Sequence, residues 1–259
     1  MSQNEWKARE EQLQRYLRLD TFPVGVNFLK KGEAFPERTT TPASMGIKIA
    51  LCQATTIARR WEWAMGVGKD DVTCIPALVG FGWRELENPQ ALVDFLMSMG
   101  YFETPEAAIK TMGKMTIMEP GQFEKLYISP LSRTKLEPDV VVIYGNPAQM
   151  MRLAQGYIYK RGGAVTSETT MGLSCATEMI VPLKEEKACL VHPGRGERVL
   201  GLAQDHEMAF TLPASQVDDL ITGLEATHQG GTRYPVQSYL LFEPMTLPQF
   251  TELETHLKP

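Results

Sequence analysis

Several features that would suggest a function at once are missing from this sequence. No apolar run reaches the roughly 18 residues that a membrane-spanning helix needs. The first residues, 1–6, lack the basic start and apolar centre of a signal peptide. Lys and Arg form no dense cluster, and a net charge of −5 with a pI near 5.5 argues against nucleic-acid binding. We therefore expect a cytoplasmic protein whose partners include neither a membrane nor a nucleic acid.

Familiar catalytic and metal-binding motifs are also lacking. The chain has neither a P-loop nor a Gly-x-Gly-x-x-Gly fingerprint, so no nucleotide ligand follows from its sequence. A Gly-x-Ser-x-Gly nucleophile elbow and a His-Glu-x-x-His zinc motif are absent as well. Only 4 cysteines and 4 histidines occur, and no two cysteines form a Cys-x-x-Cys pair. In the cytoplasm these cysteines are expected to be reduced thiols or ligands rather than disulfides.

The clearest structural signal that is present lies in residues 138–163. The run 139–144 is apolar and rich in β-branched residues, as expected for a strand buried on both faces. Asn146 and Pro147 then break the run, since Asn caps helices and Pro suits the first helical position. The apolar residues that follow recur with the period of a helix, until a Gly-Gly pair ends the pattern. This stretch predicts the first half of a βαβ unit.

The whole chain of 259 residues is short enough for one large domain. We predict a single α/β domain over residues 1–259, with a mixed or mostly parallel sheet covered by helices. Residues 84–133 contain two capped helical patterns and a less regular segment, and are expected to form a helical insertion. The strands are expected at 23–29, 139–144, 187–191 and 207–212, with a further short strand at 238–242 in the tail. In such sheets a ligand lies beyond the carboxyl end of a strand, which here is the turn at Asn146.

Three cysteines have surroundings that favour a functional role. Cys52 precedes Gln53 and an Arg-Arg pair on a predicted helix, Cys74 follows a polar turn, and Cys175 ends a run of small polar residues. Thiolates are the preferred ligands of soft metals and iron–sulfur clusters. The hypothesis is a site formed by these three cysteines, with His192 as a fourth ligand. The alternative is that they are small buried hydrophobes, as Cys189 is expected to be. A single nucleophilic cysteine, with Cys175 the better candidate, is a further alternative.

A second group of residues suits a small anion. The turn at Asn146 leads into a helix N-terminus, where unpaired N–H groups favour phosphate or carboxylate. The segment 162–170 supplies small residues and hydroxyls, among them Ser167 and Thr170, and Arg195 lies on a Gly-Arg-Gly loop suited to bidentate binding. The alternatives are an ordinary helix cap at Asn146 and a turn with a solvated arginine at Arg195.

Five segments of the chain resemble the domain of unknown function 169 family, an archaeal and bacterial group. They are Pro23-Val24-Gly25-Val26, Leu51-Cys52-Gln53, Val141 to Gln149, Ser174-Cys175-Ala176 and His192 to Gly196. The resemblance implies cysteines near the positions of Cys52, Cys74 and Cys175. Some members also have a cysteine where this chain has His192, and that departure weakens an all-cysteine cluster here. The resemblance supports a fold and a place to look, but it supplies no reaction.

Our leading hypothesis is a protein with a redox or metallo-cofactor role, in which Cys52, Cys74 and Cys175 hold an iron–sulfur cluster or zinc. The alternative is a metal-independent binding protein or transferase for a small anionic ligand at the Asn146 turn. A third possibility is a non-catalytic partner subunit. The expected partners are a small-molecule ligand or a redox partner protein, and an oligomer is compatible with the sequence.

Overall fold

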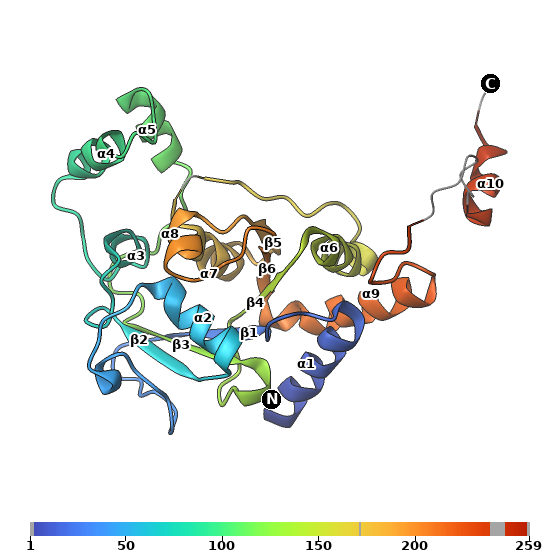
Figure 1. Cartoon of the computed structure of the whole chain (residues 1–259), viewed down its shortest axis with the longest axis horizontal. Coiled ribbons are helices and arrows are strands. Elements are labelled where there is room, and N and C mark those ends of the chain that lie inside the picture. Colours follow the sequence, from blue (N-terminus) through green and yellow to red (C-terminus); the bar gives the residue numbers. More distant parts are fainter. Residues whose placement is uncertain (1–2, 171, 239–246, 258–259) are drawn as a thin grey trace.

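The computed structural model describes residues 3–170, 172–238 and 247–257. Within them, a sheet of six strands has the order β2-β3-β1-β4-β6-β5 (Figure 1). The strands are β1 (Val24–Leu29), β2 (Met65–Gly68), β3 (Lys125–Pro130), β4 (Val140–Gly145), β5 (Cys189–Val191) and β6 (Met208–Pro213). The helices are α1 (Gln3–Leu17), α2 (Leu51–Trp61), α3 (Ile75–Gly80), α4 (Pro89–Ser98), α5 (Pro105–Met112), α6 (Pro147–Arg161), α7 (Ser174–Glu185), α8 (Arg195–Val199), α9 (Val217–Gln229) and α10 (Pro248–Glu254), with 3-10 turns at 43–45, 131–133 and 214–216.

Every pair of neighbouring strands in this sheet is antiparallel, so the prediction of a mixed or mostly parallel sheet is wrong. The central strand β4 pairs with β1 on one side and with β6 on the other. The chain returns from α6 to β5, but β6 lies between β4 and β5, so adjacent parallel strands do not form. The apolar run of β4 correctly indicated burial on both faces. Helices on both faces produce that burial here whatever the strand direction.

Most of the expected strands are present, and two strands were not expected. The segments 139–144 and 207–212 correspond to β4 and β6, each shifted by one residue. β2 and β3 were missed. β3 lies inside the range 84–133 that was predicted as a helical insertion, of which α4 and α5 occupy the first part. The strand expected at 238–242 falls largely outside the described residues. No helix in the described part of the chain is long and apolar enough to cross a membrane.

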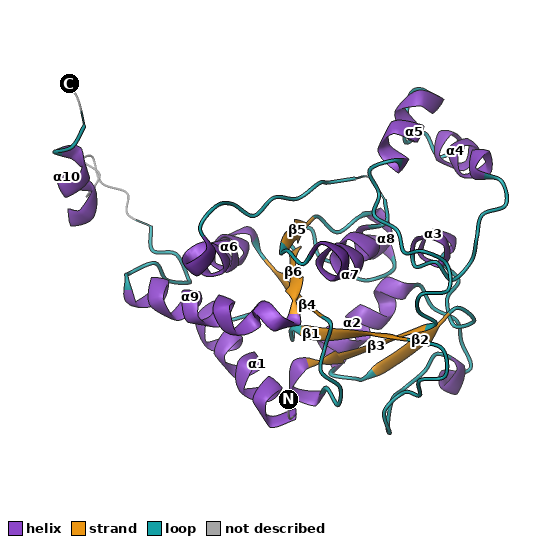
Figure 2. Cartoon of the chain, turned by 180° about the vertical axis from the view of Figure 1, so that it is seen from behind, coloured by secondary structure: helices purple, strands orange, loops and turns teal. Residues whose placement is uncertain are grey.

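Alternate residues of β4 belong to two separate hydrophobic cores. Val140, Val142 and Tyr144 face one core, and Val141 and Ile143 face the other. Helices α2, α3 and α7 close the first core, and α1, α6 and α9 close the second (Figures 1 and 2). The sheet is therefore the middle of three layers, which explains why β4 is buried on both sides.

The turn after β4 has the capped geometry that the sequence indicated. The side-chain Oδ1 of Asn146 accepts hydrogen bonds from the N–H groups of Ala148 and Gln149, both at 3.0 Å. The Gln149 side chain returns the interaction, since its Oε1 accepts from the N–H of Asn146 at 2.7 Å. This reciprocal pair is a capping box, and it satisfies the first donors of α6.

Candidate functional site

Cys52, Cys74 and Cys175 line the same pocket, which has a volume of about 260 Å³. The three cysteines come from distant parts of the chain, but each lies at the beginning of a helix. Cys52 is the second residue of α2, Cys74 immediately precedes α3, and Cys175 is the second residue of α7. The first residues of α8, among them Glu197, complete the polar part of the lining. The fold therefore gathers the three candidate cysteines around one cavity.

Two hydrogen bonds hold these helix starts together. The Sγ of Cys52 donates to the carbonyl oxygen of Gly196 over 3.8 Å, which joins α2 to α8. The hydroxyl of Ser174 accepts from the N–H of Gly194 at 3.0 Å, which joins α7 to the same segment. The Gly-Arg-Gly segment is thus one wall of the thiol pocket.

Glu197 is the most unusual group in the pocket. It is 4% exposed, and neither of its carboxylate oxygens makes a hydrogen bond of normal geometry within the described residues. Burial raises its pKa to about 7, and the nearby Ser174 hydroxyl, Gly194 N–H and Arg59 and Arg198 guanidinium groups offset only part of that effect. A carboxyl in this state gains a partner when a cation or a hydrogen-bond donor enters the pocket.

A second buried carboxyl, Glu178 on α7, lies deeper in the same region. Its Oε1 accepts a hydrogen bond from the Tyr144 hydroxyl at 2.8 Å, while its Oε2 has no partner within the described residues. Burial raises the pKa of Glu178 well above its ordinary value, and the charge of Glu197 raises it further. The two carboxyls therefore resist ionising together.

Arg59, the guanidinium whose charge acts on both carboxyls, is already paired with another glutamate. Arg59 of α2 is 1% exposed and stacks over the Tyr144 ring, 4.1 Å from its centroid. Its two terminal nitrogens contact the two oxygens of Glu207 at 2.7 and 3.0 Å. Because Glu207 already neutralises the guanidinium charge, Arg59 lowers the pKa values of Glu178 and Glu197 only in part.

Two thiols of the pocket, those of Cys52 and Cys175, are held in their protonated form. Burial, followed by the charge of Glu197, raises the pKa of Cys52 to about 12 and that of Cys175 well above its ordinary value. A nucleophilic cysteine needs a lowered pKa instead. In the described part of the chain, no group of three or more His, Cys, Asp or Glu side chains is arranged to hold a metal ion. The cysteines share a pocket without forming a ready-made cluster.

The other predicted ligands lie apart from the three cysteines. His192 is exposed and is not among the residues that line the pocket; its Nδ1 is 3.4 Å from the Thr169 hydroxyl. Cys189 is buried, with its Sγ 3.0 Å from the Thr211 hydroxyl, as expected for a core thiol.

The predicted anion-binding residues are also divided between places. Arg195 is exposed and lines the thiol pocket. Asn146 does not; its amide nitrogen donates to the Tyr234 hydroxyl at 2.8 Å, and its oxygen caps α6. Ser167 and Thr170 line another pocket of about 310 Å³, where Ser167 accepts from the Leu190 N–H at 2.7 Å. The structure brings together only Arg195 and the three cysteines.

Sequence reasoning missed both buried carboxyls. Glu197 follows the Gly-Arg-Gly segment directly and lies between Arg195 and Arg198, whose guanidinium groups indicated an anion site. The one sequence feature that could have indicated Glu197 is the position of its carboxylate within a loop already predicted to bind a ligand. Glu178 had no local signal, since its neighbours Met179 and Ile180 are ordinary core residues.

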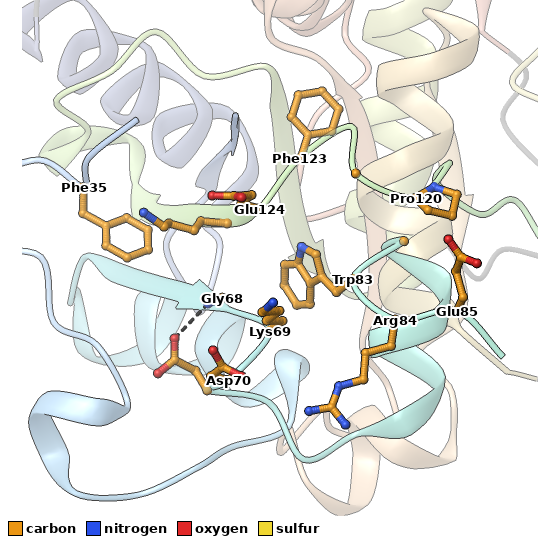
Figure 3. Close-up of a pocket in the computed structure, with 14 residues that line it drawn as sticks. Phe35, Gly68, Lys69, Asp70, Trp83, Arg84, Glu85, Pro120, Phe123 and Glu124 are labelled. Carbon is orange, nitrogen blue, oxygen red and sulfur yellow. Dashed lines mark hydrogen bonds between the residues drawn. The ribbon is translucent and has the colours of Figure 1, made fainter. Parts of the chain in front are cut away.

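A larger surface pocket of about 640 Å³ lies between β2, β3 and the loop after α3. Figure 3 shows Trp83 at its centre, with Lys69 beside it and Phe123 above, while Arg84 points away from the aromatic side chains. Basic and acidic side chains alternate around the rim, and Asp71 already accepts from the Gly68 N–H at 2.9 Å. These opposed charges favour neither an anion nor a cation.

Comparison with known proteins identifies relatives but no reaction. The profile of the domain of unknown function 169 family, described as an uncharacterised ArCR, matches residues 12–223. An uncharacterized protein of Methanocaldococcus jannaschii is 24% identical over 231 residues, which cover 88% of this chain and 97% of that protein. No solved structure matches the chain.

Proposed function

Since the chain belongs to the domain of unknown function 169 family, which brings no reaction with it, we propose a function from the pocket itself. The proposal is that Cys52, Cys74 and Cys175 hold a thiophilic metal ion, such as zinc, or an iron–sulfur cluster, in a redox or metallo-cofactor role. The observation that carries it is that three cysteines from three distant segments line one cavity. A cytoplasmic location, where thiols stay reduced, belongs to the same proposal.

The electrostatics of the pocket support a cation. Burial keeps the thiols of Cys52 and Cys175 protonated, and neither carboxylate oxygen of Glu197 makes a hydrogen bond of normal geometry within the described residues. A soft cation displaces thiol protons and forms strong bonds to the resulting thiolates, so metal binding offsets the cost of the buried charges. Glu197 replaces His192 as the fourth donor in this proposal, because Glu197 lines the pocket and His192 does not.

The helix starts support the thiolates that such binding would create. Cys52 and Cys175 lie in the first turns of α2 and α7, helices of 11 and 12 residues. Helix N-termini favour negative charge by about 0.3–1 kcal/mol each at exposed sites. That effect is too small to ionise a buried thiol alone. It therefore adds to metal ligation and does not substitute for it.

The test is metal analysis of protein purified anaerobically, before and after reconstitution with iron and sulfide or with zinc. We expect bound metal, and a net release of protons when zinc is added to the metal-free protein, because protonated thiols must ionise to bind. Cys52→Ser, Cys74→Ser and Cys175→Ser should each lower the metal content at least severalfold. Cys189→Ser is the matched control, since Cys189 does not line this pocket.

Two results would contradict the proposal. One is a folded, colourless protein that stays metal-free after reconstitution. The other is metal binding that survives all three pocket substitutions unchanged, which would locate the metal elsewhere.

A second candidate function is the binding of a small anionic ligand at Arg195. Arg195 lines the thiol pocket, is exposed, and makes no side-chain hydrogen bond or ion pair within the described residues. At the Asn146 turn, by contrast, the first N–H groups of α6 are already capped, so an anion there must displace the cap. A thermal-shift screen with phosphates and carboxylates should show saturable stabilisation that Arg195→Ala removes. A flat response across the screen would retire this candidate.

A further inference from the structure

A second cavity, with a volume of about 610 Å³, adjoins the thiol pocket. Its walls are largely apolar and include Val79, Leu92, Phe95, Met112, Met115 and Ile117, while Arg84, Glu85 and Glu119 also line it. Five residues line both cavities: Pro76, Leu92, Phe95, Met115 and Leu173. The two spaces are therefore adjacent compartments, one apolar and one bearing thiols, a carboxyl and an arginine. Ligand pockets typically have volumes of about 300–1,000 Å³ and consist of an apolar body with a few polar groups.

Helices α4 and α5 form the outer wall of the apolar compartment. They pack on each other and make few contacts with other elements, and both stand away from the three-layer body in Figures 1 and 2. Phe95 on α4 is 47% exposed, and Ile117, in the segment after α5, is 46% exposed. Large apolar side chains that line a cavity and remain half-exposed gain burial when an apolar molecule fills it.

At the polar end of this double cavity, Arg195 is the group that suits an anionic occupant. Arg195 lies at the thiol end, exposed and without a side-chain partner among the described residues. A guanidinium in this position suits a carboxylate through two parallel hydrogen bonds.

We propose that the double cavity binds an aliphatic carboxylate, with its hydrocarbon chain in the apolar compartment against Leu92 and Met115 and its carboxylate at Arg195. This inference rests on the second proposed function, because it names the class of anion that Arg195 receives. It does not depend on the metal proposal. Helices α4 and α5 would close over the chain of such a ligand.

The test is isothermal titration of the full-length protein with acetate, butanoate, hexanoate, octanoate and decanoate, with and without reconstituted metal. Affinity should rise about fourfold for each added methylene until the compartment is full. Leu92→Trp and Met115→Trp, which fill the cavity, should each weaken decanoate binding at least tenfold. Ile109→Trp is the matched control, because Ile109 is an exposed residue of α5 that lines neither cavity.

The position of the carboxylate is tested separately with 1-decanol as the uncharged probe. Arg195→Gln should lower decanoate affinity to the level of 1-decanol and leave 1-decanol unaffected. Arg84→Gln, at a residue that lines the apolar compartment but not the thiol pocket, should change neither the decanoate nor the 1-decanol affinity. If acetate binds at Arg195 but chain length has no effect, the anion function stands and the double-cavity inference fails. If neither acetate nor decanoate binds, both fail. An effect of Arg84→Gln in place of Arg195→Gln would overturn the proposed orientation.

Discussion

Burial, more than any neighbouring charge, determines the ionisation of Glu197. Removing a carboxylate from water raises its pKa, and here the nearby guanidinium of Arg59 is paired with Glu207. The same pair lowers the pKa of Glu207 although burial alone would raise it. Two glutamates near one arginine therefore have pKa values shifted in opposite directions. The unpaired one faces the thiols.

The raised pKa of Glu197 predicts a stability change with pH in the metal-free protein. Between its ordinary value of 4.5 and about 7, the folded chain keeps a proton that the unfolded chain loses, so stability falls as the pH rises. Glu197→Gln removes this loss. The free energy of unfolding of the variant, taken relative to that of the wild type, should therefore rise by about 3 kcal/mol between about pH 4 and pH 8. Urea unfolding at both pH values measures it.

The control for this experiment is Glu225→Gln, since Glu225 is exposed on α9. The difference in free energy of unfolding between this variant and the wild type should be the same at both pH values. A Glu197→Gln variant whose stability relative to the wild type is the same at both pH values would show that the carboxyl is hydrated in the folded state.

At the scale of elements, α6 and α9 pack so closely that their backbones nearly touch. A Cβ atom added at Gly223 would collide with the backbone carbonyl of Gly156, and one added at Gly156 would meet Leu220 and Leu224 at 2.9–3.1 Å. The two glycines therefore permit the close crossing of these helices. Along the same contact, the Arg152 guanidinium donates to the Leu224 carbonyl at 3.1 Å.

Gly223→Ala should therefore destabilise the protein strongly. The colliding atom belongs to the backbone, so it cannot rotate away, and the helices must separate to make room. Overpacking costs about 1–3 kcal/mol, and the backbone collision places Gly223→Ala at the upper end of that range, measurable as a lower urea midpoint. Gly230→Ala is the control, because an added Cβ there meets only ordinary contacts at 3.5 Å. Equal effects of both substitutions would mean that the helix crossing adapts.

Helices and strands were predicted well where neighbouring residues alone determine their conformation. The apolar run at 139–144 and the Asn146-Pro147 cap both specify their own conformations, and β4 and α6 follow them. Strand direction was predicted wrongly because it depends on which distant segment pairs with β4. β6 occupies that place, and no residue within β4 encodes the choice.

In the candidate site, too, the residues with a local sequence signal were found and those that depend on the fold were not. The polar surroundings of Cys52, Cys74 and Cys175 singled out these three residues, and they do line one pocket. That they hold a metal stays a prediction. His192 was predicted as a fourth metal ligand from its neighbours in sequence, but it is exposed and does not line the pocket. Glu178 and Glu197 became visible only through the fold, since burial is a property of the assembled layers.

At the scale of the whole molecule, the three-layer body and the α4–α5 pair are unequal in stability. The body buries two cores on either side of the sheet, whereas α4 and α5 each bury a single side chain, Val93 and Ala108. Regions with few buried contacts open without global unfolding.

Hydrogen exchange of the full-length protein should reveal this difference. Backbone amides of residues 89–112 should lose protection well before those of β1, β4 and β6, because opening the helical pair exposes little core. Saturating decanoate should slow exchange in 89–112 and leave the sheet unchanged. Protection of 89–112 equal to that of β4 would indicate instead that the pair unfolds only with the body.

The pocket is lined by segments that leave the ribosome at very different times. Cys52 and Cys74 emerge early, Cys175 follows after four of the six strands, and the α8 wall comes later still. A nascent chain therefore cannot complete this cavity until residues 195–200 have been synthesised. Whatever occupies the cavity has to be acquired after that point.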